Sequence, residues 1–250
     1  MTLRDLAPGP VRLAYRYVRL QIQARRLMRA AAGAATPAQW LDVLGRFPTF
    51  LAIQKASEIT ALLEMMRRAR PERVCEIGTA LGGTSFLLAR AAAPGATIIL
   101  VDPAFDAARE AALRRFAGPG QRVHCLRGLS TDVRIRSRLE RLLGGRPLDL
   151  LFVDGDHSYE GVSADVASYG PLVRAGGLIA FHDIVPVHSE AVAAATGAWA
   201  GGVPQLWREL RGRYGAAASE FVDDPAQDGC GIGLLAWPGA SHTGSPTSRQ

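Results

Sequence analysis

The stretch that decides the fold runs from Leu148 to Ile184 and reads LDLLFVDGDHSYEGVSADVASYGPLVRAGGLIAFHDI. Two short apolar runs, Leu148–Val153 and Leu178–Phe181, flank a segment whose apolar residues recur with helical spacing. A strand, a helix and a strand of these lengths form a βαβ unit, and its crossover makes the two strands parallel. The stretch therefore predicts a parallel sheet covered by helices.

Polar clusters follow both of these predicted strands. The first strand is followed by DGDH at residues 154–157, and the second by His182 and Asp183. Open α/β sheets bind their ligands at the carboxyl ends of the strands, so we expect two acids and two histidines to converge there. Within the first cluster, Asp156 is expected to cap the following helix.

The rest of the chain repeats the alternation of strands and helices. The predicted strands are Arg73–Ile77, Thr97–Val101, Arg122–Leu126, Leu148–Val153, Leu178–Phe181, Glu220–Val222 and Gly231–Trp237. The predicted helices are 10–32, Ala38–Arg46, Ala52–Arg68, Leu81–Ala93, Ala107–Phe116, Asp132–Leu143, Tyr159–Val173, Ser189–Ala195 and Gln205–Tyr214. This order predicts a doubly wound, Rossmann-like α/β sheet of seven strands, mostly parallel, with a C-terminal antiparallel hairpin and N-terminal helices.

Length and composition place few other limits on the protein. The 250 residues are 48% hydrophobic and 21% charged, which is ordinary for a globular protein with one core. No apolar run reaches transmembrane length, and the three cysteines share no metal-ligand spacing, so we expect a cytoplasmic protein. The expected domains are a helical extension at 1–50, the sheet domain at 51–237 and a disordered tail at 238–250.

The net charge of +6 is confined to the N-terminus. Residues 1–30 hold seven arginines and one aspartate, so residues 31–250 sum to zero. A neutral body argues against nucleic acid as a partner. The helix at 10–32 is either one that binds a membrane surface or an acidic partner, or one that packs on the body or on a second subunit. The second interpretation is favoured, so we expect a homo-oligomer and no membrane contact.

A glycine-containing loop follows the first strand and reads EIGTALGGTS at residues 76–85. Gly78 and Gly82 allow a tight turn and a close approach to a ligand. The spacing is not that of a pyrophosphate-binding loop, and Glu76 at its start favours a ligand with hydroxyl groups or positive charge. Asp102, at the end of the second strand, suits ribose hydroxyls. The two acids fit S-adenosylmethionine (SAM), which carries a sulfonium and no phosphate.

Over about residues 50–237 the chain resembles the class I SAM-dependent methyltransferases. The resemblance rests on the E-x-G-x-x-x-G-G loop, Asp102, the cluster at Asp154 and Gly176-Gly177 before the fifth strand. It implies that Asp102 binds the ribose and that residues 128–130 flank the adenine. The residues that it assigns to cofactor binding are Glu76, Gly78, Thr79, Gly82, Thr84, Ser85, Asp102, Ser130 and Asp154.

The two polar clusters carry a narrower resemblance. D-G-D-H-x-Y-E followed by G-G-x-I-x-x-H-D is similar to metal-dependent O-methyltransferases that tailor natural products and sugars, the relatives of macrolide sugar O-methyltransferases and cephalosporin hydroxylase-like proteins. The resemblance implies that Asp154 and Asp183 ligate Mg²⁺ and that His157 is the base. His182 is either a third metal ligand or a packed, hydrogen-bonded histidine. It departs from the relatives, which often carry an acid at this position. Imidazole is softer than carboxylate, which leaves Mn²⁺, Fe²⁺ or a metal-free site open.

These observations predict a SAM-dependent O-methyltransferase that acts on a hydroxyl of a sugar or natural-product metabolite, with a divalent metal. The alternatives are methylation of a catechol or another phenol, and a non-catalytic scaffold that keeps the fold and the cofactor site. Before the sheet, Gln54, Lys55 and Glu58 are expected to be solvated surface residues rather than parts of the site.

Overall fold

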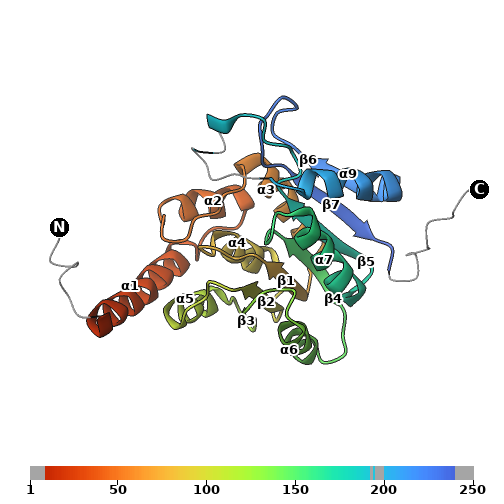
Figure 1. Ribbon diagram of the computed structural model, residues 1–250. Coiled ribbons are helices and arrows are strands. Elements are labelled where there is room, and N and C mark those ends of the chain that lie inside the picture. The colour runs from red at the N-terminus through yellow and green to blue at the C-terminus, as the bar shows by residue number, and fades with distance from the viewer. Residues whose placement is uncertain (1–8, 192–193, 195–199, 240–250) are drawn as a thin grey trace, which may run out of the picture.

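The computed structural model describes residues 9–191, 194 and 200–239, and it shows one twisted sheet between layers of helices (Figure 1). The strands are β1 (Arg73–Ile77), β2 (Thr97–Asp102), β3 (Arg122–Arg127), β4 (Leu148–Val153), β5 (Val173–His182), β6 (Ala218–Phe221) and β7 (Ile232–Trp237). They lie in the order β3-β2-β1-β4-β5-β7-β6. Strands β1 to β5 are parallel, and β7 runs antiparallel to both β5 and β6. The predicted fold class is confirmed.

Helices cover both faces of the sheet and form a separate core on each. The helices are α1 (Gly9–Ala30), α2 (Pro37–Gly45), α3 (Ala56–Ala69), α4 (Gly83–Ala91), α5 (Ala107–Leu113), α6 (Val133–Leu143), α7 (Tyr159–Tyr169) and α9 (Val203–Tyr214), with short 3₁₀ turns η1 (Arg114–Phe116), η2 (Gly170–Leu172) and η3 (Gly215–Ala217). Residues of α1 to α5 share one core, and residues of α6, α7 and α9 share the other. Because both faces are covered, the central strands read as continuous apolar runs.

Side-chain caps fix where several helices begin. Thr36 accepts a hydrogen bond from the Gln39 amide in a capping box before α2. Ser158 caps α7 by accepting from the Gly161 amide at 3.0 Å. The expectation that Asp156 caps this helix is wrong: its carboxylate accepts from the Ser158 amide at 2.9 Å and shapes the preceding turn.

Strand β5 begins five residues earlier than predicted, at Val173 rather than Leu178. Pro171, which has no amide hydrogen, stands in the η2 turn that ends the preceding helix. Val173 pairs with Leu148, and a register irregularity follows before Leu178 pairs with Leu150. Gly176, with φ of +69°, lies in this irregular part. The glycine pair therefore bends a strand that has already started.

Helix α3 also differs from its prediction, because it begins at Ala56 and not at Ala52. The preceding residues are extended, and the Leu51 carbonyl accepts from the Gly83 amide at 3.2 Å. A Cβ on Gly83 would lie 2.3 Å from the Leu51 carbonyl carbon. Pairing with the start of α4 therefore keeps this segment out of the helix and lays it over the loop after β1.

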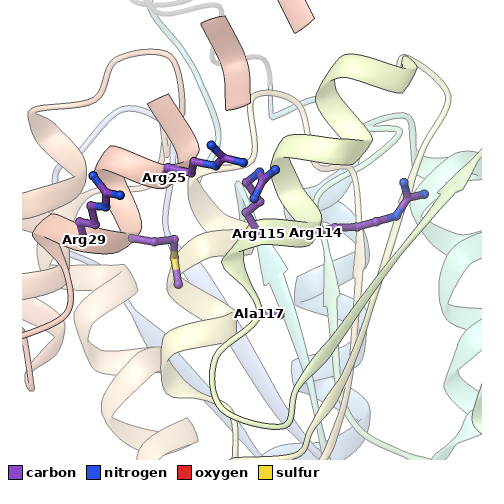
Figure 2. Close-up of a pocket in the computed structure, with 6 residues that line it drawn as sticks. Arg25, Arg29, Arg114, Arg115 and Ala117 are labelled. Carbon is purple, nitrogen blue, oxygen red and sulfur yellow. The ribbon is translucent and has the colours of Figure 1, made fainter. Parts of the chain in front are cut away.

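Helix α1 packs along α5, and its outer end extends away from the sheet (Figure 1). Arginines of α1 and η1 line a depression at one side of this contact (Figure 2). None of the helices among the described residues is both long and apolar enough to cross a membrane. The predicted helix Ser189–Ala195 lies partly, and the predicted tail after residue 239 entirely, outside the described residues.

At the amino ends of the strands one carboxylate ties three strands together. Asp149 of β4 accepts from the amides of Glu72 and Arg73, both at 2.9 Å, and from the Arg174 guanidinium of β5 at 2.8 Å. These hydrogen bonds hold the pKa of Asp149 below its usual value although burial acts to raise it. Asp149 therefore stays ionised and anchors the edge opposite the polar clusters.

We predict that Asp149→Ala lowers the free energy of unfolding by about 2–4 kcal/mol, because two partly buried amide hydrogen bonds and a guanidinium lose their acceptor. Urea unfolding at neutral pH measures the change. Asp42→Ala is the matched control, since the Asp42 ion pair with Arg46 is exposed and should contribute at most about 0.5 kcal/mol. Equal losses in both variants would contradict the anchoring role.

Candidate active site

The loop after β1 lies directly against the chain that leaves β4. The Asp154 amide donates to the Ile77 carbonyl at 2.8 Å, and the Gly78 amide donates to the Val101 carbonyl at 2.9 Å. Gly78 has φ of +83°, and a Cβ there would lie 1.9 Å from the Asp154 carbonyl oxygen. Only glycine fits both the conformation and the contact. The ends of β1, β2 and β4 are thereby joined at one place.

Asp102 lies beneath this loop at the end of β2. One carboxylate oxygen accepts from the amides of Thr79 and Ala80 at 2.9 and 2.8 Å, and the other accepts from the Ala104 amide at 2.7 Å. A carboxylate has about four acceptor sites, so these three bonds orient Asp102 and leave capacity for a hydroxyl donor. This geometry fits the predicted role of Asp102 in binding ribose hydroxyls.

Glu76 is buried under the loop instead of standing at its mouth. One oxygen accepts from the hydroxyls of Thr79 and Ser85, whereas the other is buried with no partner among the described residues. Burial raises the pKa of Glu76 to about 8, although the two hydroxyl bonds act to lower it. Near neutral pH the Glu76 carboxyl is therefore largely protonated. A polar ligand could form the missing hydrogen bond with its unpartnered oxygen.

A short chain of hydrogen bonds joins the loop to the chemical end of the site. The Thr84 hydroxyl donates to the Gln54 carbonyl oxygen at 2.8 Å, and the Gln54 amide donates to Asp154 at 2.9 Å. Gln54 is 8% exposed. The expectation that it is a solvated surface residue is wrong, because the extended segment before α3 carries it inward. Gln54 thus positions one oxygen of Asp154.

The two predicted polar clusters converge as expected. The His157 imidazole lies between two carboxylates, with Nε2 at 3.4 Å from Asp154 and Nδ1 at 3.6 Å from Asp183. His182 Nδ1 lies 3.1 Å from Asp154 and 3.3 Å from Asp183. Donor atoms of Asp154, His157 and Asp183 all lie within 4.8 Å of one another. Such a group has the composition and size of a metal site.

His182 is almost completely buried and holds the two carboxylates together. Burial acts to lower its pKa, but the charge of Asp154 and hydrogen bonds with Asp154, Asp183 and Cys230 raise it well above its usual value. His182 and the two carboxylates therefore stabilise one another in this arrangement. Burial acts to raise the pKa of Asp154, but its contacts with His182 and His157 hold that pKa below its usual value. The sequence prediction of His182 as a metal ligand is not tested by these contacts.

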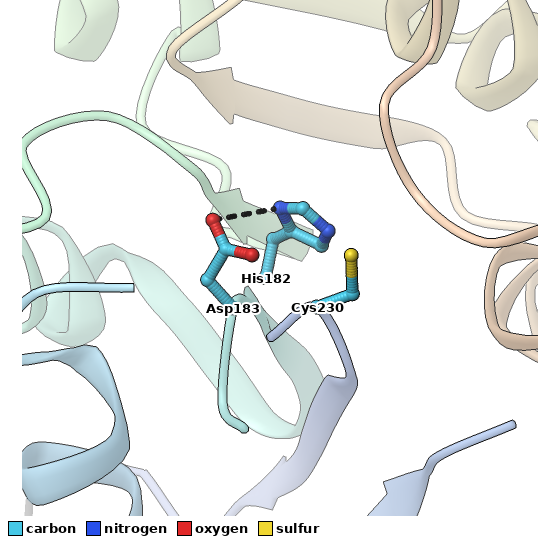
Figure 3. A group of neighbouring side chains, drawn as sticks. All are labelled: His182, Asp183 and Cys230. Atoms are coloured by element: carbon cyan, nitrogen blue, oxygen red, sulfur yellow. Dashed lines mark ion pairs between the residues drawn. The ribbon is translucent and has the colours of Figure 1, made fainter. Parts of the chain in front are cut away.

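Cys230 is a member of this cluster that the sequence did not indicate. Figure 3 shows its thiol facing the His182 ring, with Asp183 on the other side, and ligand atoms of the three residues lie within 4.8 Å of one another. Asp183 and Cys230 both have φ of +61°, a strained backbone for residues other than glycine. No local spacing places Cys230 here; the pairing of β7 with β5 does.

Glu58 supports this strained segment from α3. Its carboxylate accepts from the Gly231 amide at 2.9 Å and from the Gln227 side chain at 2.7 Å. Glu58 is 1% exposed, so the expectation of a surface residue is wrong. Ser130, predicted near the adenine, is partly buried, and its carbonyl accepts from the Tyr169 hydroxyl at 2.8 Å. Its contact with a cofactor stays a prediction, as do those of the other loop residues.

Residues 75–184 match the family model described as a methyltransferase domain. This span contains the glycine loop, Asp102 and both polar clusters. Residues 75–184 form a methyltransferase domain. Over 112 residues the chain is also 35% identical to an uncharacterized protein of Acanthamoeba polyphaga mimivirus, with 43% of this chain covered. The match spans about half of that relative, 49% of its length.

Solved structures show the same fold around the methyltransferase domain. The O-methyltransferase TomG of Streptomyces achromogenes, involved in tomaymycin synthesis and solved with SAM, aligns over 87% of this chain and 90% of its own, with 21% identity and a TM-score of 0.53. MycE of the mycinamycin biosynthetic pathway, solved with Mg and S-adenosylhomocysteine, aligns over 91% of this chain and 57% of its own, with 18% identity and a TM-score of 0.51. The class I methyltransferase fold expected from the sequence is confirmed.

The buried carboxyl of Glu76 gives the domain a testable pH dependence. A folded pKa of about 8 lies above the ordinary value of 4.5. Protonated Glu76 therefore stabilises the folded protein. This contribution is fully present below the pKa of Glu76 in the unfolded chain, and it is lost as the pH rises through the pKa of Glu76 in the folded protein. We predict that the free energy of unfolding of the wild-type protein falls between about pH 5 and 8, and that Glu76 contributes up to ~1.4 kcal/mol to this fall for each pH unit.

Glu76→Gln removes this titration and should flatten the pH dependence over the same range. Urea unfolding at several pH values measures both curves. Glu64→Gln is the control, because Glu64 is partly exposed on α3 and pairs with Arg67. A Glu76→Gln curve as steep as that of wild type would show that Glu76 is ionised in the folded protein.

Proposed function

We propose that this protein is a SAM-dependent O-methyltransferase that acts on a hydroxyl of a small molecule carrying neighbouring oxygens. The observation that carries the proposal is the position of the Asp154, His157 and Asp183 group. It adjoins the glycine loop, since Asp154 is bonded to the strand that leads into Gly78. A sugar or natural-product diol and a catechol both present two adjacent oxygens.

The residues at the cofactor end of the site have groups that suit SAM. Asp102 retains acceptor capacity for ribose hydroxyls, and the unpartnered oxygen of Glu76 is available for a hydrogen bond with a polar group of the ligand. The close packing at Gly78 places backbone against backbone where the glycine loop meets Asp154. Bound SAM would supply a sulfonium methyl group, and the protein supplies the position and the base.

The chemical end fits a hard divalent cation such as Mg²⁺. Asp154 and Asp183 offer carboxylate oxygens, and one Asp183 oxygen is buried without a partner among the described residues. Bound there, the ion would lower the pKa of an acceptor hydroxyl. The side chain of His157 is 23% exposed, more than those of Asp154, Asp183 and His182. His157 is therefore the residue placed to receive the acceptor proton.

In this proposal His157 is the base, and the residues around it hold and position the reacting groups. His157 takes the hydroxyl proton on an imidazole nitrogen, and the neighbouring Asp154 and Asp183 stabilise the imidazolium. The acceptor oxygen would then take the methyl group from the sulfonium of SAM, and the carbon–sulfur bond would break. The products are a methyl ether and S-adenosylhomocysteine. His182 and Gln54 hold Asp154 from two sides and act as positioning residues.

Calorimetric titration of SAM tests the cofactor part of the proposal. We predict that Asp102→Asn weakens SAM binding roughly 10–100-fold, because a charge-assisted acceptor of the ribose is lost. Asp106→Asn is the control, since Asp106 caps α5 outside the site. EDTA should leave SAM binding unchanged and abolish methyl transfer to a panel of sugar diols and catechols until Mg²⁺ is restored. Absence of SAM binding under every condition would favour the non-catalytic scaffold.

A further inference from the structure

The outer side of α1 carries an exposed row of apolar side chains. Val11, Tyr15, Val18 and Ile22 are 55%, 53%, 54% and 44% exposed. Their spacing of four, three and four residues places them on one side of a helix. Leu20, on the opposite side, is buried in the core. We call these four exposed residues the apolar stripe; packing of α1 on the body leaves it uncovered.

The apolar stripe continues into a group of arginines. Arg25 and Arg29 follow Ile22 at the same spacing. With Arg114 and Arg115 of η1 they line a depression of about 420 Å³ (Figure 2). Arg114 pairs with a carboxylate of α5, whereas Arg25 and Arg29 have no carboxylate partner among the described residues. Two guanidinium groups are thus available to an anion.

This basic surface extends beyond α1. Arg114 also lines a second depression of about 320 Å³ together with His124, Arg138 and Arg141. Arg138 and Arg141 are exposed on α6, and His124 lies on β3, an edge strand of the sheet. Helix α1 itself contains six arginines and no carboxylate. One edge of the molecule is therefore basic although residues 31–250 sum to zero.

The combination of stripe and arginines selects one class of partner. A second copy of the chain would bring arginine-rich helices together, and like charges oppose that contact. Nucleic acid offers phosphates but no apolar phase for valine and isoleucine. An anionic lipid surface offers both, since apolar residues enter the boundary between headgroups and acyl chains while arginines meet lipid phosphates.

We propose that α1 docks this protein on anionic phospholipid membranes, with the apolar stripe in the headgroup–acyl boundary and with Arg25 and Arg29 on lipid phosphates. This inference is independent of the proposed methyl transfer. The sequence alone favours a helix that packs on the body or on a second subunit. The structure shows that packing and also shows that it uses the other side of α1.

Co-sedimentation of the full chain with vesicles tests the proposal. We expect binding to phosphatidylcholine vesicles that contain about one third phosphatidylglycerol, and little binding to pure phosphatidylcholine. Val11→Ser/Val18→Ser/Ile22→Ser should weaken the partition onto anionic vesicles at least about tenfold, because less apolar area is buried. Arg25→Gln/Arg29→Gln should weaken it by roughly tenfold and reduce its salt dependence.

Matched controls separate docking from general charge and surface effects. Leu129→Ser/Val133→Ser removes exposed apolar groups elsewhere, and Arg68→Gln/Arg146→Gln removes two exposed arginines away from α1. Both controls should bind like wild type. Failure of wild type to bind anionic vesicles, or equal losses in variants and controls, would overturn the proposal. So would a stripe variant that lowers the mass in light scattering and leaves vesicle binding unchanged, since the stripe would then be a contact between copies.

Discussion

The site depends on the contact between Gly78 and the backbone of Asp154. A side chain at residue 78 would have to occupy the space of the Asp154 carbonyl, at 1.9 Å. Because the two segments touch backbone to backbone, the ends of β1 and β4 meet without intervening side chains, and the Val101 carbonyl joins β2 to the same place. The glycine loop, Asp102 and the Asp154 cluster are therefore fixed relative to one another by the sheet rather than by loop side chains.

This geometry gathers acidic groups, and each is stabilised in a different way. Glu76 is buried deeply enough to keep its proton, with a pKa of about 8. Asp102 accepts three backbone amides. The pKa of Asp154 stays below its usual value despite burial because His182 and His157 lie beside its carboxylate. Without such arrangements the repulsion among these carboxylates would oppose folding. The arrangement also leaves an acidic site prepared for positively charged ligands.

Much of this followed from the sequence because it depends on local patterns. Asp102, Asp154 and Asp183 each end an apolar run, and the rule that parallel strands present their carboxyl ends together is enough to bring them close. Gln54, Glu58 and Cys230 escaped prediction for the opposite reason. Their positions depend on pairings between segments far apart in the chain, such as Leu51 with Gly83 and Glu58 with Gly231, which no periodicity encodes.

The exposed side of α1 likewise could not be predicted from local sequence patterns. A helix with apolar residues on two sides is ambiguous in sequence, since either side can pack on the body. The structure shows which side packs, and hence which one remains for a partner. The early start of β5 has a similar origin, because Val173 joins the strand through its pairing with Leu148 and not through an apolar run of its own.

The most direct test of the account is whether Asp154 and Asp183 together hold a divalent ion. Titration of Mn²⁺ into the protein, followed by the electron paramagnetic resonance signal of the free ion, measures this without an acceptor or SAM. The account predicts one site in wild type and in His188→Gln, whose histidine is exposed. It predicts that Asp154→Asn and Asp183→Asn each weaken this site by at least about tenfold. Unchanged Mn²⁺ binding in both aspartate variants, or no binding in wild type, would contradict it.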